Sequence, residues 1–315
     1  MSKKVLAIFY TQSGQLGEII DNFTGPLIAS GISVEKVSVK LAKDYPFPWT
    51  ADRFFSVMPD CVLDVPAELA PFQLKEKQYD LVILGYQAWF LSPSIPFNSL
   101  LRHPVLKAVL KDTPVITITG ARNMWLNAFV RVKKLIHATG AQLVGNIALV
   151  DTHPNPVSFV TIFHWMLHGK KDRYLNIFPP PGVADADIKH TTVFGQLVLP
   201  HLNSNKWEGL QDELVMDGAV KLNYNLMVIE SVAGKIFAFW ANFIVKRKNR
   251  APWLKVFKYY LLIAFFVGAP IVITIDAIFF RLFSPKRIKA KKQYYLNFKL
   301  ILIILSYAWY RSLHK

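Results

Sequence analysis

Short apolar segments alternate with amphipathic ones through the first 150 residues, and this alternation restricts the possible folds more than any other feature. Unbroken apolar, β-rich runs are typical of parallel strands, because helices cover both faces of a parallel sheet. The spacing predicts five strands, at Lys4–Tyr10, Ser33–Val39, Tyr79–Tyr86, Pro114–Gly120 and Ala141–Val150. Helices are predicted between them, at Leu16–Ser30, from about Phe97 to Leu110, and at Asn123–Thr139. We therefore expect a doubly wound α/β sheet of order 2-1-3-4-5, whose ligand lies outside the carboxyl ends of the strands.

The alternation stops after Val150, and helical spacing takes its place. Helices are predicted at Val157–His168, at Asp185–Leu202 and from about Asp217 to Lys246, with the breaker Pro179-Pro180-Pro181-Gly182 after the first of them. We therefore expect three parts. These are an α/β domain at 1–150, a helical extension on the substrate side at 151–245, and a tail at 246–315.

The tail is both strongly basic and apolar. Residues 241–315 contain 15 Lys and Arg residues and one acidic residue, Asp276, so they carry +14 of the net charge of +16. Basic tails bind nucleic acids or anionic membrane surfaces. Basic residues interleaved with long apolar runs favour the membrane. We therefore expect an anionic membrane surface as a partner, and no nucleic acid.

The apolar run Tyr259–Phe280 has 22 residues, just enough to span a bilayer core of roughly 30 Å. Basic clusters flank both of its ends, so the positive-inside rule gives no orientation and both flanks prefer the cytoplasm. Because Pro270 interrupts the run, we expect a Pro-kinked re-entrant hairpin or a helix in the membrane plane. Burial of 259–310 in a soluble core is the alternative. A second run, Leu300–Tyr310, is too short to span and ends in residues typical of the interface.

The N-terminal sequence Met-Ser-Lys-Lys leads directly into a strand, so we expect no signal peptide. Combined with the basic tail, this leads us to expect the protein on the cytoplasmic face of the inner membrane. The single cysteine, Cys61, excludes an internal disulfide, and we interpret it as a structural thiol.

The loop after the first strand reads Thr11-Gln12-Ser13-Gly14-Gln15, followed by Leu16 at the start of the helix. A strand-to-helix turn offers backbone N–H groups and the positive end of a helix to an anion. Thr11 and Ser13 add hydroxyl groups, and Gly14 lets the backbone close around oxygen atoms. The loop has no basic residue and does not match the Walker pattern, which disfavours ATP and suits a flavin monophosphate. An ordinary polar turn is the alternative.

The loop after the third strand contains Gln87, Ala88, Trp89 and Phe90. A flavin ring needs a flat apolar wall and backbone donors at its pyrimidine edge. Trp89, Phe90 and the preceding Tyr86 are candidates for the wall. A local hydrophobic cluster under the next helix is the alternative.

The loop after the fourth strand runs from Thr119 and Gly120 through Arg122 and Asn123 to Trp125. Asn123 is a candidate cap for the helix that follows. Arg122 is a candidate to neutralise a reduced flavin or to hold an anionic substrate group, and a solvated surface arginine is the alternative. Taken together, the three loops predict FMN as the cofactor.

The segments TQSGQL, YDLVILGYQAWFLSPSIP and ITGARNMW resemble those of flavodoxin-like oxidoreductases. More narrowly, they are similar to the bacterial dialkylresorcinol condensing enzymes, and the likeness extends to the segment PPPGVADADI that ends at Ile188. The resemblance implies an aromatase step in aryl-lipid biosynthesis. In this step a flavin oxidises a dialkyl-cyclohexanedione, supplied by a partner ketosynthase, to a dialkylresorcinol.

Such an oxidation needs a base that removes a proton beside the carbonyl group, and histidine is suited to this near neutral pH. His153 follows the fifth strand, where the ligand edge is expected, and Asp151 is a candidate to orient it. A loop histidine without a role is the alternative. His164 and His168 lie one helical turn apart, but no carboxylate or cysteine completes the pattern, so we expect no metal site.

These features predict a membrane-associated, FMN-dependent oxidoreductase that acts on a lipophilic ring. An NAD(P)H-dependent quinone reductase and a non-catalytic flavin electron carrier are the alternatives. We also expect a possible homodimer.

Overall fold

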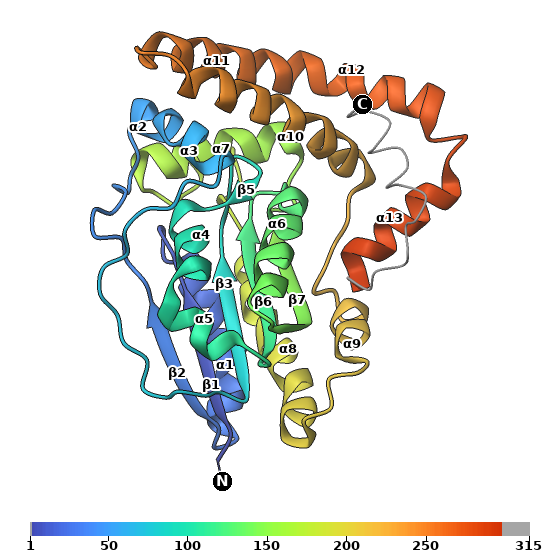
Figure 1. The fold of residues 1–315 in the computed structure, drawn as a ribbon. Coiled ribbons are helices and arrows are strands. Elements are labelled where there is room, and N and C mark those ends of the chain that lie inside the picture. Colours follow the sequence, from blue (N-terminus) through green and yellow to red (C-terminus); the bar gives the residue numbers. More distant parts are fainter. Residues whose placement is uncertain (1, 298–315) are drawn as a thin grey trace.

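Five parallel strands form one sheet in the computed structural model, which describes residues 2–297 (Figure 1). They are β1 (Lys4–Phe9), β2 (Ser33–Ser38), β3 (Leu81–Tyr86), β6 (Pro114–Ala121) and β7 (Gln142–Val150). Across the sheet the order is β2-β1-β3-β6-β7, which is 2-1-3-4-5 when these five strands are counted alone. The predicted flavodoxin-like fold is therefore confirmed. A small antiparallel hairpin of β4 (Ala88–Trp89) and β5 (Ser92–Pro93), which the sequence pattern does not predict, follows β3.

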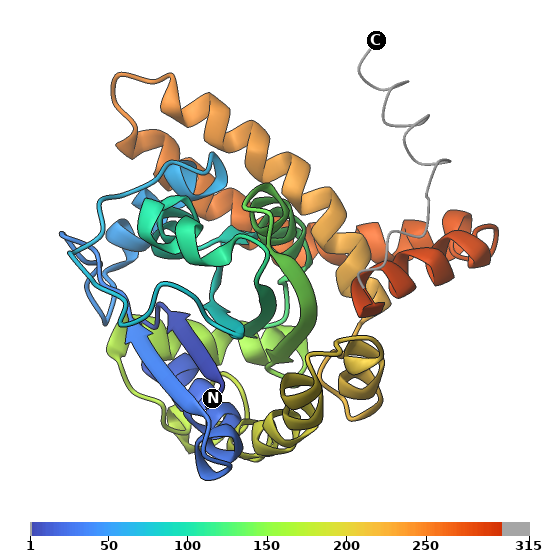
Figure 2. The ribbon, with the colours of Figure 1, turned by 60° about the horizontal axis from the view of Figure 1, so that its bottom comes forward.

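Helices cover both faces of the sheet, as the unbroken apolar strands require. One face carries α1 (Gln15–Ala29) and α8 (Asp185–Ser204), and the other carries α4 (Ile95–Arg102), α5 (Pro104–Leu110) and α6 (Leu126–Ala138) (Figure 2). α1 and α8 approach closely at Gly195, where a Cβ atom would lie 2.1 Å from the carbonyl oxygen of Phe23. Only glycine fits at that crossing. The remaining helices of the body are α2 (Ala51–Ser56), α3 (Met58–Val62), α7 (Asn155–His168), a 3-10 turn at Tyr174–Asn176 and α9 (Leu210–Met216).

Three helices differ from their predicted bounds by more than a shift of one or two residues. The helix expected from about Phe97 to Leu110 is divided into α4 and α5, because Pro104 keeps His103 in an extended conformation. α6 begins at Leu126, so residues 123–125 remain part of the loop. The helix expected from Asp217 begins later, as α10 (Tyr224–Val245), whose first turn is capped by Asn223.

A helical hairpin lies across the carboxyl ends of the strands (Figure 1). Its first arm is α10, and its second arm is a continuous helix, Ala251–Phe280. The second arm consists of α11 (Ala251–Ile263), η2 (Ala264–Gly268), α12 (Ala269–Ile275) and η3 (Asp276–Phe280), and α13 (Pro285–Asn297) follows it. At the open end of the hairpin, the Tyr224 hydroxyl donates to Asp276 at 3.1 Å, and Asp276 pairs with Arg281 at 3.6 Å. The one acidic residue of the tail thus joins the two arms.

The re-entrant turn expected at Pro270 is wrong, because one helix continues through this residue from Ala251 to Phe280. A proline lacks an N–H group, and its ring crowds the carbonyl group one turn earlier. The wide π-helical turn η2 comes directly before α12 and relieves that crowding. The second apolar run, Leu300–Tyr310, lies outside the described residues.

A buried carboxylate, Glu230, attaches α10 to the body. Its Oε1 accepts the backbone N–H of Asn127 at 2.6 Å, and the Asn127 amide donates to the Glu230 carbonyl oxygen at 2.8 Å. The start of α6 favours a negative charge at this position. Burial is the stronger effect, and it raises the pKa of Glu230 to about 7.

This raised pKa predicts a pH dependence of stability. Between the ordinary value of 4.5 and about 7, the folded chain binds a proton that the unfolded chain has lost. The free energy of unfolding should therefore fall as the pH rises through this window, by up to about 3 kcal/mol, and level off above it. In denaturant titrations between pH 5 and 8, Glu230→Gln should lose part of this fall, whereas the variant Glu208→Gln at an exposed position should not. An unchanged fall in Glu230→Gln would contradict the assignment.

Candidate functional site

Four loops meet at the carboxyl edge of the sheet. They follow β1 (residues 10–14), β3 (87 and the β4–β5 hairpin), β6 (122–125) and β7 (151–154). The helical hairpin covers this edge, and α7 also lies beside it (Figure 1). The edge therefore brings together all three loops that the sequence assigns to a cofactor.

The loop after β1 forms a cradle at the start of α1. Gly14 has a left-handed conformation (φ +88°), and no atom lies within 4 Å of the position that a Cβ atom would take. The first N–H groups of an α-helix have no intrahelical acceptor, and the cap residue Gly14 has no side chain to bind those of α1. The Thr11 hydroxyl oxygen is buried and has no hydrogen-bond partner among residues 2–297. Ser13 is half-buried beside them, and Leu16 is buried in the core.

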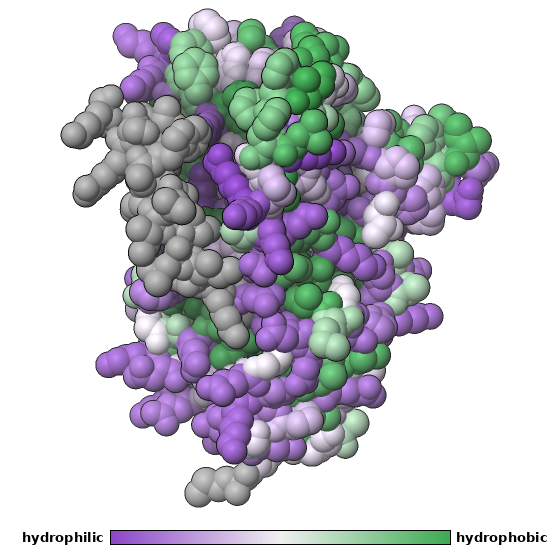
Figure 3. All heavy atoms as spheres, turned by 90° about the vertical axis from the view of Figure 1, so that its right-hand side faces the viewer, coloured by the Kyte–Doolittle hydropathy of each residue, from purple (hydrophilic) through white to green (hydrophobic). Residues whose placement is uncertain are grey.

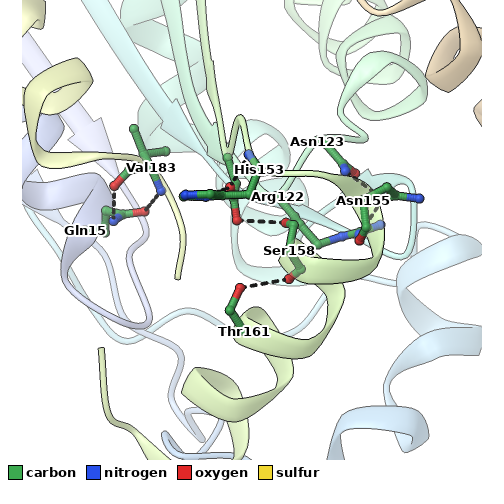
Figure 4. Close-up of polar contacts among 9 residues, drawn as sticks. Gln15, Arg122, Asn123, His153, Asn155, Ser158, Thr161 and Val183 are labelled. Atoms are coloured by element: carbon green, nitrogen blue, oxygen red, sulfur yellow. Dashed lines mark hydrogen bonds and ion pairs between the residues drawn. The ribbon is translucent and has the colours of Figure 1, made fainter. Parts of the chain in front are cut away.

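Both glutamines of this loop bind other parts of the protein. Gln12 accepts the indole N–H of Trp49 at 2.8 Å. Gln15 exchanges two hydrogen bonds with the backbone of Val183, at 3.1 and 3.2 Å (Figure 4). The two side chains thus fix the walls of the cradle. Trp49 and Val183 are site residues that the sequence did not indicate, because they approach the loop only through the tertiary fold.

The loop after β3 turns back as the β4–β5 hairpin. Phe90 and Leu91 both have positive φ values (47° and 61°), the backbone that a two-residue hairpin requires and that non-glycine residues rarely adopt. Phe90 packs against Phe54 at 4.8 Å between ring centroids. Ala88 pairs with Pro93 in the hairpin. The buried Gln87 Oε1 has no partner within the described part of the chain.

The aromatic residues near this hairpin differ in position. Trp89 is half-buried and forms T-shaped contacts with Tyr10, Tyr45 and Trp49, with ring centroids 5.5 to 6.0 Å apart. Tyr86 is fully buried and packs against Phe97 at 5.2 Å. Trp89 therefore lies at the edge of the site, whereas Tyr86 belongs to the core beneath it. The Cys61 thiol lies below the hairpin, 3.2 Å from the Trp89 carbonyl oxygen, and burial raises its pKa strongly.

The loop after β6 holds a largely enclosed arginine. Arg122 Nη1 donates to Asn155 Oδ1 at 2.7 Å, and the guanidinium lies 5.4 Å from the centre of the Phe265 ring. Burial lowers the pKa of Arg122 to about 10, although the nearby Asp151 opposes this shift. Arg122 therefore links the sheet edge to α7 and to the helical hairpin, so it is not a solvated surface residue.

The other residues of this loop have structural contacts. Thr119 donates its hydroxyl hydrogen to the Tyr86 carbonyl oxygen at 2.8 Å, and a Cβ atom on Gly120 would lie 3.1 Å from Ile19. Trp125 is buried. The expected capping of α6 by Asn123 is wrong, because Trp125 occupies the cap position and the Glu230 carboxylate binds the free N–H of Asn127. Instead, Asn123 donates to Asn155 at 2.8 Å.

The loop after β7 brings Asp151 and His153 together. His153 Nδ1 lies 2.7 Å from Asp151 Oδ1, which also accepts the backbone N–H of His153 at 2.9 Å. The other oxygen of Asp151 accepts the Ser158 hydroxyl at 2.8 Å. Asp151 is buried, whereas the His153 side chain is 35% exposed. Figure 4 places His153, Arg122 and Ser158 between the Gln15–Val183 pair and the Asn123–Asn155 pair. The predicted orientation of His153 by Asp151 matches this contact.

A cavity of about 470 Å³ opens beside His153. It is bounded by the loops after β6 and β7, by the first turns of α6 and α10, and by Ile273 of α12. The carboxyl edge of the sheet thus carries the cradle at the start of α1, a histidine–carboxylate pair and, beside that pair, a cavity.

The two histidines of α7 hydrogen-bond other groups of the protein, and His168 Nδ1 lies 3.0 Å from the His164 carbonyl oxygen. His164 Nε2 lies 2.8 Å from Asp172, and its ring packs against those of His168 and Tyr174. Within residues 2–297, no three His, Cys, Asp or Glu side chains gather as a metal site requires.

No protein-family model matches this chain, and no curated protein matches it. Several solved structures are similar to part of it. An FMN complex of a flavoprotein from Lactobacillus acidophilus NCFM is 16% identical over 47% of this chain and 93% of its own, with a TM-score of 0.39. Oxidised flavodoxin 1 from Bacillus cereus is 16% identical over 63% of this chain and 99% of its own (TM-score 0.34). A flavodoxin from the domain Archaea is 8% identical over 64% and 99% (TM-score 0.36). Similarities this distant assign neither cofactor nor activity, and the fold follows from the strand order of the chain itself.

Proposed function

We propose that this protein binds FMN at the carboxyl edge of its sheet and acts as a flavin-dependent oxidoreductase. The cradle at the start of α1 carries the proposal. It combines an uncapped helix N-terminus, a left-handed glycine and the buried, unpartnered hydroxyl group of Thr11. Converging N–H and O–H donors at a positive helix end fit a phosphate group bound without a metal ion.

The loops after β3 and β6 would hold the flavin ring. Trp89 supplies an aromatic side chain beside the cradle, and the buried Gln87 Oε1 offers an acceptor to a ring N–H group. Arg122 would place a positive charge near the ring, where reduction builds up negative charge. When bound, FMN would supply the acceptor for a hydride and pass the electrons on to O2 or another oxidant.

His153 is the proposed base. Its Nδ1 is engaged by Asp151, so Nε2 is left to take a proton from a substrate in the cavity. The buried Asp151 would fix the tautomer and stabilise the imidazolium that forms, and Ser158 would hold Asp151 in place. The ring that is oxidised loses this proton together with the hydride.

The sequence resemblance supports one class of substrate, a dialkyl-cyclohexanedione. In the proposed reaction a dialkyl-cyclohexanedione, supplied by a partner ketosynthase, loses two hydrogen atoms and becomes a dialkylresorcinol. Anaerobic incubation of the full-length, FMN-loaded protein with a 2,5-dialkylcyclohexane-1,3-dione tests this proposal. We expect bleaching of the flavin together with a resorcinol product. Bleaching by NADPH alone would favour the quinone reductase, and bleaching by neither compound would favour an electron carrier.

We also propose that the protein rests on an anionic membrane surface through the second arm of the helical hairpin. Both arms are long and apolar enough to cross a bilayer, yet only 6% of the most apolar part of the second arm is buried within the protein. Phe257 packs on Phe55 and Phe265 packs on Phe159, so one side of this arm follows the body along its length. Such an arm fits the membrane plane better than a crossing.

The surface of the hairpin supports this placement. Hydrophobic side chains gather at the end of the molecule where the hairpin lies (Figure 3). Basic residues lie at both ends of the second arm: Lys246, Arg247, Lys248, Arg250, Lys255 and Lys258 before or at its start, and Arg281, Lys286, Arg287, Lys289, Lys291 and Lys292 after it. Each basic residue near an anionic surface contributes about 1 kcal/mol to binding.

The double variant Ile263→Gln/Phe266→Gln tests the membrane contact. These side chains are 63% and 52% exposed on the second arm, so their loss should weaken binding to phosphatidylglycerol-containing vesicles at least about tenfold. Ile28→Gln, which changes a side chain that is 48% exposed on α1, is the control and should bind as wild type does in vesicle sedimentation. Equal binding by all three proteins would contradict the placement.

A further inference from the structure

The cavity beside His153 has one polar and one apolar wall. The polar wall contains Asn123, Asp151, His153 and Asn155, from the loops after β6 and β7 and the start of α7. The apolar wall contains Leu226 and Ile229 of α10 and Ile273 of α12, and the polar residues Lys221, Asn223 and Asn225 line the cavity next to it, before and at the start of α10. The two walls suit an amphipathic molecule with its polar part at the sheet edge and its apolar part along the hairpin.

The polar wall contains an unused hydrogen-bond acceptor. Asn123 is only 8% exposed, and its amide nitrogen donates to Asn155 at 2.8 Å. Its Oδ1 is buried and has no partner among the described residues. Asp151, the one carboxylate in this wall, already accepts bonds from His153 and Ser158. A buried carbonyl oxygen without a partner costs about 1–3 kcal/mol, which a ligand O–H group would relieve.

The apolar wall connects the cavity with the exposed face of the hairpin. Ile273 lines the cavity, whereas its neighbours Ile271 and Ile275 on the same helix are 53% and 45% exposed. Only one helix, α12, therefore separates the cavity from the face proposed to contact lipid. An alkyl chain leaving the cavity along this wall would reach that face without crossing water.

We propose that this cavity binds the hydroxylated ring of an alkyl-chain amphiphile, with a phenol or enol O–H donating to Asn123 Oδ1 and the chain lying along Leu226, Ile229 and Ile273. This inference rests on the proposed function and deepens it, because it describes how the ring to be oxidised is bound. His153 lies in the same wall, so the ring is held next to the proposed base.

The test uses 5-pentylresorcinol as the probe and the full-length protein in detergent, titrated calorimetrically with and without FMN. Ile273→Trp fills the cavity and should weaken probe binding at least about tenfold. Ile275→Trp, two residues away on the exposed face, is the matched control and should bind as wild type does. The dimethyl ether of the probe lacks O–H donors and should bind wild type at least about tenfold more weakly.

The outcomes separate this inference from the FMN proposal. Equal probe binding by the two tryptophan variants, or equal binding of the probe and its ether, would overturn the inference. An FMN affinity that falls in Ile273→Trp would also overturn it, because the cavity would then hold the flavin ring. Probe binding that depends on Ile273 in a protein that binds no FMN would support the cavity and reject the proposed function.

Discussion

Ser13→Asp is expected to lower the affinity for FMN by roughly 100-fold, or about 2.7 kcal/mol. Ser13 lies in the cradle, directly before Gly14 at the start of α1. A carboxylate there would repel the phosphate dianion at close range. The same carboxylate is favourable for the helix itself, because it complements the positive end of α1. The variant should therefore lose FMN affinity without losing thermal stability, as measured by FMN fluorescence quenching and by thermal unfolding without cofactor.

Ser13→Asn is the matched control for this prediction. It has the size of aspartate without its charge, so its FMN affinity should stay within about tenfold of wild type. If the two variants bind FMN equally well, the phosphate does not lie in this cradle.

His153→Gln is expected to lower turnover by about 10²–10⁴-fold while leaving the bound flavin unchanged. Glutamine keeps a polar side chain of similar length but cannot accept the proton. FMN affinity and the visible spectrum should match wild type, because His153 lies in the loop after β7 and not in the cradle. Turnover is measured as resorcinol formation from the dialkyl-cyclohexanedione.

Two further variants define the role of the pair. His137→Gln changes an exposed histidine in the last turn of α6 and should keep full turnover. Asp151→Asn should lower turnover less than His153→Gln and shift its pH profile, because Asp151 acts through the imidazole and is a positioning residue. Turnover by His153→Gln at the wild-type rate would contradict the assignment of the base.

The sequence predicts the central sheet well for a physical reason. The inner strands are buried on both faces, so runs such as Leu81–Tyr86 are almost entirely apolar, and the carboxyl ends of parallel strands meet at one edge. The three loops and the Asp151–His153 pair follow directly from this geometry. The contact between Asp151 and His153 is local, because the two residues are only two positions apart, and a local contact can be predicted from the sequence.

Other features depend on long-range packing that no local pattern encodes. Val183 reaches Gln15 across 168 positions, and Glu230 reaches the start of α6 across 103. The prediction that Asn123 caps α6 failed for this reason, because the distant Glu230 carboxylate binds the free N–H of Asn127 at the start of that helix. The expected re-entrant turn at Pro270 failed because the π-helical turn before it, which no sequence pattern indicates, lets the helix continue without the missing hydrogen bond.

The helical hairpin gives the fold its distinguishing arrangement. It covers the edge where a flavodoxin-like sheet binds its ligand, contacts Arg122 through Phe265, and places Ile273 in the wall of the cavity. Its other face is apolar and flanked by basic residues. The cavity beside His153 and the proposed membrane contact are thus separated by a single layer of helix.

The central proposal is that this chain binds FMN. The visible absorption spectrum of the full-length protein, purified in detergent and then incubated with FMN and desalted, tests it most directly. We expect a yellow protein with flavin absorption bands and one FMN per chain, and a much lower occupancy in Ser13→Asp. A colourless preparation that takes up no added FMN would contradict the proposal.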